Sequence, residues 1–152
     1  MGVTVKKMNK FLMFKLPSAY ICGVKLNQLT NEKAVVLVKH RWINQNPFNS
    51  MYFAVQSMAA ELTTGAIVIK KIKESNKNIS MLVTNHQGAF TKKAVGVIKF
   101  ICNDGVLIDE ALKRTIETGE GQKITMESIG VDESGDQVSV YKFEWSIKLK
   151  SK

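Results

Sequence analysis

Hydrophobic residues recur along the chain with helical and strand periods, and these periods predict the first elements. Residues 6–16 carry apolar side chains at helical spacing, and Pro17 ends the helix that they predict. Two runs, 23–29 and 33–42, predict a β-hairpin around the polar residues 30–32. Alternation places on one face of the second strand Ala34, Val36, Val38, His40 and Trp42.

Residues 51–72 follow a different pattern, with apolar side chains almost all round a helical cylinder. A helix that is apolar on every side has to be enclosed on every side. Gly65 within it indicates a bend or a close contact, because glycine weakens a helix interior. Lys70, Lys71 and Lys73 close the segment with the charge that a helix C-terminus favours.

The rest of the chain predicts four more strands and an amphipathic helix. The last strand alternates most regularly, with Tyr141, Phe143, Trp145, Ile147 and Leu149 on one face. The expected strands are 79–85, 94–102, 123–132 and 137–149, and the expected helix is 105–118. We therefore predict an α+β fold in which a curved antiparallel sheet of about six strands wraps around the long helix 51–72. Extra helices are expected near 6–16 and 105–118.

Composition indicates one globular domain over residues 1–152. Hydrophobic residues make up 45% of the chain and charged residues 23%, and no linker or repeat interrupts it. The longest apolar stretch, 58–69, contains Glu61 and Thr63, so we expect no membrane span. No export signal is convincing, and we expect a cytoplasmic protein. Cys22 and Cys102 lack metal-ligand spacing and are expected to be buried free thiols.

The formal net charge of +9 raises the question of a nucleic-acid partner. The lysines are spread along the chain, and the two arginines, Arg41 and Arg114, lie far apart. No cluster of arginine and aromatic residues suited to reading bases is present, so a solvated basic surface is favoured over nucleic-acid binding. A functional alternative is attraction of a small polyanion, such as the phosphates of coenzyme A.

Glu61 is the first candidate for chemistry. It lies in the most apolar helix, where an ionised carboxylate is costly unless it is paired or reaches water. Such a carboxylate often has a raised pKa and a functional role. Two structural alternatives stay open, namely an exposed edge of the helix or an ion pair with a strand residue such as Arg41.

Asn46 is the second candidate. Because it precedes Pro47, it fits an N-cap with proline at the first helical position. Its functional alternative is orientation of a substrate or water beside the helix N-terminus. There, backbone N–H groups around residues 52–54 would stabilise a carbonyl oxygen that gains negative charge.

The two histidines are isolated in the sequence. His40 is expected to be a core or edge residue with its polar groups satisfied rather than a catalytic one, and His86 to lie at a strand end or in a turn.

The run Trp42-Ile43-Asn44-Gln45-Asn46-Pro47-Phe48-Asn49-Ser50-Met51-Tyr52-Phe53-Ala54, with Met58 to Gly65, resembles an uncharacterised bacterial hotdog-fold family whose members are labelled thioesterases. The ending 135–148 is also similar to it. That family resembles in turn the acyl-CoA thioesterases of the phenylacetate-pathway type, in which an asparagine precedes a His-Gly-Gly segment at the helix start and a carboxylate follows on the helix. The match places the asparagine at Asn46 and the carboxylate at Glu61. It departs from the pattern at Tyr52, Phe53 and Ala54, which replace His-Gly-Gly.

The resemblance implies an acyl-CoA thioesterase-like hydrolase that works as a homodimer or a dimer of dimers. Its site would lie at the subunit interface, with Glu61 as general base or nucleophile, Asn46 as orienting residue, and residues Tyr52, Phe53 and Ala54 against the substrate. No metal or cofactor is implied beyond the coenzyme A of the substrate. The alternative is a non-catalytic module that binds acyl-CoA or lipid on the same fold.

Overall fold

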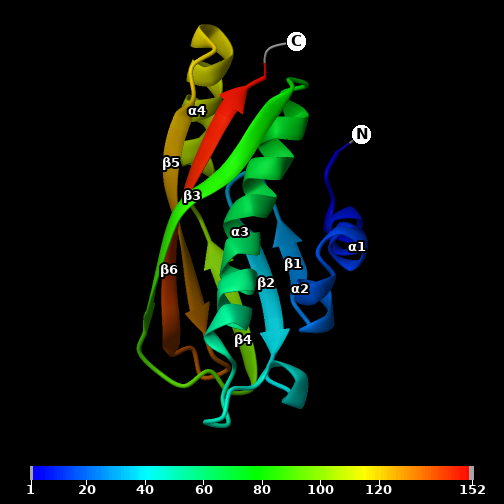
Figure 1. Cartoon of the computed structure of the whole chain (residues 1–152), viewed down its shortest axis with the longest axis vertical. Coiled ribbons are helices and arrows are strands. Elements are labelled where there is room, and N and C mark those ends of the chain that lie inside the picture. Colours follow the sequence, from blue (N-terminus) through cyan, green and yellow to red (C-terminus); the bar gives the residue numbers. More distant parts are fainter. Residues whose placement is uncertain (1, 151–152) are drawn as a thin grey trace.

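The computed structural model describes residues 2–150, in which a curved antiparallel sheet holds one long helix against its concave face (Figure 1). The strands are β1 (Lys25–Leu29), β2 (Ala34–Lys39), β3 (Ile79–Phe90), β4 (Val97–Cys102), β5 (Gln122–Val131) and β6 (Gln137–Leu149). The helices are α1 (Val5–Lys15), α2 (Pro17–Ile21), α3 (Phe53–Glu74) and α4 (Gly105–Thr118), with a 3-10 turn, η1, at Trp42–Asn44. The strand order across the sheet is β1-β2-β4-β5-β6-β3.

Helix α3 is the long central helix that the sequence predicts. Strand residues that face it are fully buried, as in the β2–β4 pairs Val36↔Phe100 and Val38↔Ile98. On β6, Tyr141, Phe143, Trp145 and Ile147 alternate into the same core, which confirms the strongest period-2 pattern of the chain.

Enclosure of α3 is incomplete along one stripe. Ala54, Ser57, Met58 and Glu61 are only half-buried, and their spacing of three and four residues places them in line on one side of the helix. The expectation of enclosure on every side is therefore wrong along this stripe.

Gly65 marks a close contact rather than a bend. A Cβ atom at this position would lie 3.1 Å from the Trp145 ring. Because Trp145 is buried and its indole N–H donates to the Thr64 hydroxyl at 2.9 Å, the ring has little freedom to withdraw. The helix thus approaches β6 at a point where only glycine fits without displacement.

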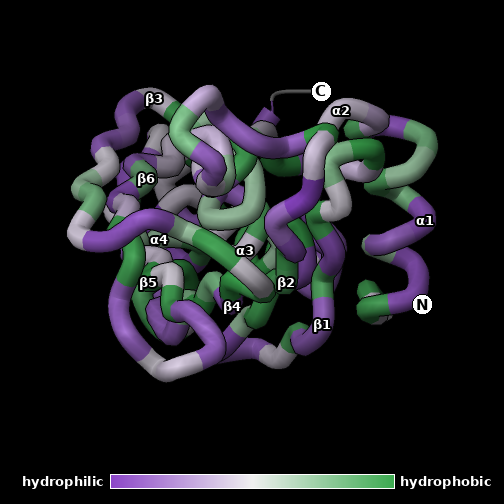
Figure 2. The backbone as a smooth tube through the Cα atoms, turned by 90° about the horizontal axis from the view of Figure 1, so that it is seen from below, coloured by the Kyte–Doolittle hydropathy of each residue, from purple (hydrophilic) through white to green (hydrophobic). Residues whose placement is uncertain are grey.

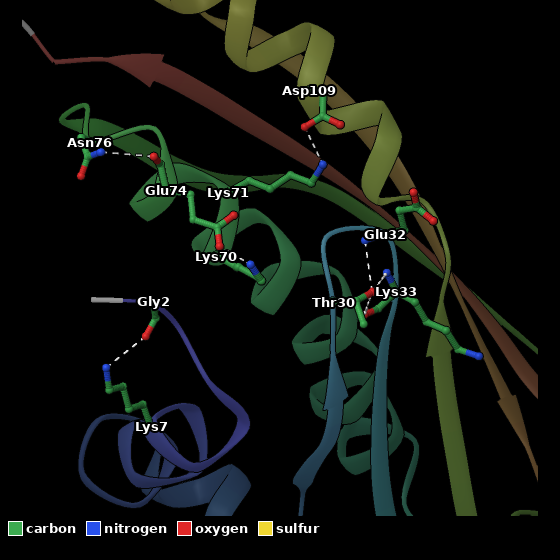
Figure 3. A network of polar contacts seen from close by, with 10 residues as sticks. All are labelled: Gly2, Lys7, Thr30, Glu32, Lys33, Lys70, Lys71, Glu74, Asn76 and Asp109. Carbon is green, nitrogen blue, oxygen red and sulfur yellow. Dashed lines mark hydrogen bonds and ion pairs between the residues drawn. The ribbon is translucent and has the colours of Figure 1, made fainter.

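Helix α4 confirms the predicted amphipathic segment, and Gly119 ends it in the left-handed conformation with φ 74°. It packs beside the C-terminal part of α3. The buried Lys71 of α3 forms an ion pair with Asp109 of α4 at 2.5 Å (Figure 3). One of the lysines that the sequence places at the end of α3 therefore also joins two helices.

Strand β2 ends earlier than the sequence suggests, and Trp42 does not share its buried face. The Trp42 side chain is 81% exposed, within η1. The cause is the buried Asn44, whose amide donates to the carbonyl groups of Lys39 and Cys22 at 2.8 and 2.9 Å and accepts from the Arg41 N–H at 2.8 Å. These bonds satisfy the backbone where the strand would continue, and the chain turns.

Strand β3 is longer than predicted. It continues through the polar residues 84–88 to Phe90, because β6 offers a pairing partner over the whole length, from Ile79↔Leu149 to Phe90↔Ser139. His86 consequently lies inside a strand, stacked on the Phe143 ring, and not at a strand end or in a turn. Strand β4 begins at Val97, and the short helix α2 after Pro17 was not predicted.

The two thiols are free, but they differ in burial. Cys102 is buried as expected, whereas Cys22 is half-buried, so the expectation for Cys22 is wrong. Over residues 2–150, none of the helices combines the length and hydropathy that crossing a bilayer requires.

Candidate active site

The loop that leads into α3 is organised around Asn46. The Asn46 side-chain oxygen accepts from the backbone N–H groups of Phe48 at 2.9 Å and Ser50 at 3.2 Å, and from the Ser50 hydroxyl at 3.2 Å. Its amide group donates to the Ser50 hydroxyl at 3.0 Å and to the Met51 carbonyl at 3.4 Å. Asn46 is thus the centre of a compact turn, in the manner typical of asparagine in loops.

Asn46 is not the N-cap of the helix, so that alternative is wrong. The residue before α3 is Tyr52, whose extended backbone has ψ 136° and whose side chain makes no capping bond. Six residues, 47–52, separate Asn46 from Phe53, where the helix begins.

The N-terminus of α3 has unused donors. The Tyr52 N–H donates to the Asn44 carbonyl at 2.9 Å. Within residues 2–150, no protein acceptor is found for the N–H groups of Phe53 and Ala54. Two backbone donors at the positive end of a 22-residue helix suit an oxygen that carries partial negative charge.

A cleft of about 530 Å³ opens over this helix end. One wall is the loop with Asn46 and Phe48, and the other comes from the end of β3 and the chain after it. The residues that line it are Asn46, Pro47, Phe48, Ser50, Met51, Tyr52, Phe53, Gln56, Phe90, Thr91, Lys92, Lys93 and Ala94. Four aromatic rings and two lysine side chains therefore line the cleft at the N-terminus of α3.

The aromatic rings at the cleft are arranged edge to face. The Phe53 ring is 4.9 Å from that of Tyr52 and 6.5 Å from that of Phe90. Phe53 is 54% exposed, so its ring forms part of the open surface of the cleft. Such a surface is suited to contact with an apolar chain or a flat group.

The lysines of the cleft differ in their bonding. Lys92 pairs with Asp132 at 2.5 Å and Asp136 at 2.8 Å, which raises the pKa of its ammonium group. Lys93 donates to the Phe48 carbonyl at 3.3 Å and has no acidic partner among the described residues. Lys93 is therefore the lysine of the cleft whose charge no acidic side chain of the described chain neutralises, so it is available to bind an anion.

Glu61 lies two turns further along α3, outside this cleft. Burial raises the pKa of its carboxyl group to about 7. Over residues 2–150 its carboxylate has no hydrogen-bond or ion-pair partner, while its side chain is still partly exposed. Arg41 donates instead to the Ile21 carbonyl at 3.4 Å, so the expected alternative of an Arg41 pair is wrong.

The structure thus brings Asn46, Tyr52 and Phe53 together at one cleft and leaves Glu61 apart. Eight residues of helix separate Phe53 from Glu61, or about 12 Å along the axis. Gln56, Phe90 and Lys93 were missed as cleft residues. Gln56 is buried and accepts from the Ser139 hydroxyl at 2.9 Å, and its position one turn after Phe53 was the only signal in the sequence.

His40 differs from the satisfied histidine that was expected. Its ring nitrogen Nε2 is buried without a hydrogen-bond partner in the described part of the chain. It is not among the residues of the cleft.

Solved structures define the class of this fold. A Pseudomonas aeruginosa protein of unknown function, described as a probable thioesterase, superposes with a TM-score of 0.84 at 18% identity, over 99% of each chain. A Chlorobaculum tepidum protein of unknown function gives 0.83 at 16% identity, covering 96% of this chain and 94% of that one. A Haemophilus influenzae thioesterase gives 0.75 at 11% identity, covering 98% and 93%. The fold is therefore the hotdog fold found in thioesterase-like proteins, as predicted.

The family is defined by sequence. The model of the family described as domain of unknown function DUF4442 matches residues 5–147, and the chain belongs to that family. None of the curated proteins matches the sequence significantly.

Proposed function

We propose that this protein is an acyl-CoA thioesterase-like hydrolase whose site forms between two subunits, similar to the thioesterases of the phenylacetate-pathway type. The observation that carries the proposal is the Glu61 carboxyl group, whose pKa is raised by burial to about 7 while no partner in the described chain neutralises it. A general base works best when its pKa lies near the working pH. The free N–H groups of Phe53 and Ala54 supply the matching site for the oxyanion.

The separation of Glu61 from the cleft supports a site that two subunits share. Strand β3 is paired on one side only, with β6, and its residues 84–90 are exposed. A long unpaired edge is a template for another strand. The half-buried stripe of α3, from Ala54 to Glu61, is likewise uncovered. A second copy paired edge to edge along β3 would cover this stripe and bring the Glu61 of one subunit towards the helix N-terminus of the other.

In the proposed reaction, water attacks the thioester carbonyl carbon while ionised Glu61 accepts its proton. The carbonyl oxygen, now negatively charged, is held by the N–H groups of Phe53 and Ala54. The C–S bond then breaks, and the coenzyme A sulfur leaves with the proton that Glu61 returns. The products are a carboxylic acid and free coenzyme A. Alternatively Glu61 attacks the carbonyl carbon directly, the C–S bond breaks as the coenzyme A thiolate leaves and takes up a proton, and water hydrolyses the resulting anhydride to the acid and free Glu61.

The other candidate residues have supporting roles. Asn46 is a positioning residue, because both ends of its side-chain amide already bond within the loop. Tyr52, Phe53 and Ala54 contact the acyl group, and bulky rings in place of His-Gly-Gly narrow the entrance. The Lys93 ammonium group attracts the phosphates of coenzyme A. No metal or further cofactor takes part.

A panel of acyl-CoA esters assayed for thiol release tests the proposal. We expect turnover of at least one ester, rising with pH through about 7 as Glu61 ionises. Lys93→Gln should raise KM more than it lowers kcat, whereas Lys113→Gln, which removes an exposed lysine of α4, should leave both unchanged. Absence of thiol release across short, long and aromatic esters would remove the hydrolase proposal.

A second candidate is a non-catalytic module that binds acyl-CoA or lipid. It is favoured by the paired aromatic rings of Tyr52 and Phe53, which stand where the resemblance places the histidine and the first glycine of His-Gly-Gly. Native mass spectrometry of the purified protein distinguishes the two functions. An intact acyl thioester that remains bound for hours supports the binding module, whereas its conversion to acid and thiol supports the hydrolase.

A further inference from the structure

The segment formed by α1 and α2 presents large hydrophobic side chains to solvent at one flank of the molecule. Phe14 is 72% exposed, although it lies within a well-formed helix. Lys7, Phe11 and Phe14 follow one another at helical spacing, with Lys10 one turn before Phe14, so they form one outward stripe. Further exposed apolar residues of the segment are Met13, Leu16, Tyr20 and Ile21. We call this surface the α1–α2 face.

The face is held in place by the fold. The Asn9 side chain accepts from the Leu26 N–H and donates to the Leu26 carbonyl, both at 2.9 Å. The Asn9 side chain thereby makes with the edge of β1 the two hydrogen bonds that the backbone of a neighbouring strand would make. Met8 and Leu12 are buried on the opposite side of α1, so the helix has a fixed inner face and a fixed outer one.

The charge around the α1–α2 face has a single sign. From residue 2 to residue 31 the chain contains Lys6, Lys7, Lys10, Lys15 and Lys25 and neither aspartate nor glutamate. The lysines of α1 make no ion pair in the described part of the chain, and the Nζ of Lys7 donates only to the Gly2 carbonyl at 3.0 Å (Figure 3). Hydrophobic and cationic residues therefore alternate along this helix, and in Figure 2 the tube of α1, at one side of the molecule, changes between hydrophilic and hydrophobic colours.

The α1–α2 face is also separate from the proposed active site and from the proposed subunit contact. Helix α1 lies beyond β1, at one edge of the sheet, whereas β3 forms the other edge (Figure 1). Pairing of two copies along β3 leaves this face uncovered on each subunit. It needs a different partner.

We propose that the α1–α2 face docks on the surface of an anionic lipid bilayer. Exposed phenylalanine, leucine and isoleucine side chains enter the boundary between headgroups and acyl chains, while the lysines remain among the anionic headgroups. Helix α1 lies in the plane of the surface, as amphipathic helices with lysine-rich polar faces do. The protein binds a bilayer without crossing it.

Two features favour a bilayer over an acidic protein. Phe14 protrudes from the helix with 72% of its surface exposed, which suits insertion into a fluid bilayer, whereas Phe11 lines a hollow beside Ile69 of α3. The lysines are also interleaved with the apolar residues on the same helix rather than forming one separate patch, so they can stay among anionic headgroups while the rings beside them enter the boundary below.

Sedimentation of the full chain with lipid vesicles tests the proposal. We expect binding to phosphatidylcholine vesicles that contain about 30 mol% phosphatidylglycerol, and little binding to phosphatidylcholine alone. Salt at about 0.5 M should weaken the binding strongly, because it screens the lysines. The lipids are the probe, and no acyl-CoA is needed, so failure here leaves the hydrolase proposal untouched.

Variants locate the binding surface. Phe14→Ser should weaken vesicle binding about tenfold, because a phenylalanine side chain no longer leaves water. Lys10→Gln should weaken it about fivefold, the effect of one lysine near an anionic surface. The controls on α4, Leu107→Ser and Lys113→Gln, also change exposed residues and should bind as the parent does. Circular dichroism melts verify that all four variants fold.

Three results would overturn the proposal. The first is absence of binding to the anionic vesicles at low salt. The second is equal loss of binding in the α1 and α4 variants, which would indicate attraction by net charge alone. The third is a lower molecular mass for Phe14→Ser in light scattering, without vesicle binding by the parent, which would show that a second copy of the chain covers the face.

Discussion

At the scale of single residues, Glu61 links the stability of the fold to pH. Burial raises the pKa of its carboxyl group to about 7 in the folded chain, against the ordinary value of 4.5 that the unfolded chain approaches. Between these values the folded protein keeps a proton that the unfolded chain has lost. The free energy of unfolding therefore falls as pH rises through this window, and the loss is complete above pH 7.

Glu61→Gln is expected to stabilise the protein at alkaline pH and to have little effect at acid pH. The gain should reach about 1–3 kcal/mol above the pKa, less than the full shift implies because the side chain is partly exposed. Urea unfolding at pH 5 and at pH 8 measures it. Glu74→Gln, at an exposed position of the same helix, serves as control and should show no such pH dependence. Equal effects of Glu61→Gln at both pH values would contradict the raised pKa.

Asn46 provides a second prediction at this scale. Asn46→Ala removes the acceptor of the Phe48 and Ser50 N–H groups, and should lower the free energy of unfolding by about 1–2 kcal/mol. Asn46→Asp keeps that acceptor and should cost less. Urea unfolding ranks the two variants. If alanine and aspartate have the same effect, the turn around Asn46 does not depend on these two bonds.

At the scale of elements, β3 passes very close to the buried Tyr141 on β6. A Cβ atom at Gly88 would lie 2.7 Å from the Tyr141 ring. Gly88→Ala should therefore destabilise the protein by about 1–3 kcal/mol, because the ring has to move within a packed core. Gly121→Ala is the matched control, since its nearest contact would be an ordinary 3.8 Å. Thermal unfolding compares the two variants. Similar melting temperatures would contradict the prediction, because β3 would then accommodate the added methyl group without loss of stability.

The sequence predicts best those helices and strands that have a buried face. Residues 141–147 alternate between apolar and polar side chains, and α3 is apolar almost all round. Both patterns follow directly from burial, so the predicted bounds of β6 and α3 lie close to the observed ones. The second half of β3 is exposed and polar, and only its pairing with β6 makes it a strand. No local pattern contains that information.

The residues of the candidate site likewise fall into those that the sequence predicts and those that it does not. Glu61 could be recognised because it contrasts with the apolar helix around it. Gln56, Phe90 and Lys93 could not, because they reach one cleft only after β3 and the α3 entry loop are packed together. The N-cap interpretation of Asn46 failed because its side chain bonds to the loop rather than to the helix.

At the scale of the whole molecule, the stripe of α3 and the edge of β3 predict a dimer. The parent should have a mass of at least twice 17.0 kDa in light scattering. Met58→Lys places a charge in the middle of the stripe and should shift the protein towards the monomer, because a buried unpaired charge is costly. Leu107→Lys, on exposed α4, should leave the mass unchanged. A monomeric parent would rule out the shared site.

The hydrolase account depends most on Glu61, and thiol release by Glu61→Gln tests it most directly. With an acyl-CoA ester that the parent hydrolyses, kcat should fall at least about a hundredfold in this variant, while binding of the ester and folding persist. Glu74→Gln should retain the parent's rate. Parent-like turnover by Glu61→Gln would contradict the account, because the carboxylate would then take no part in the reaction.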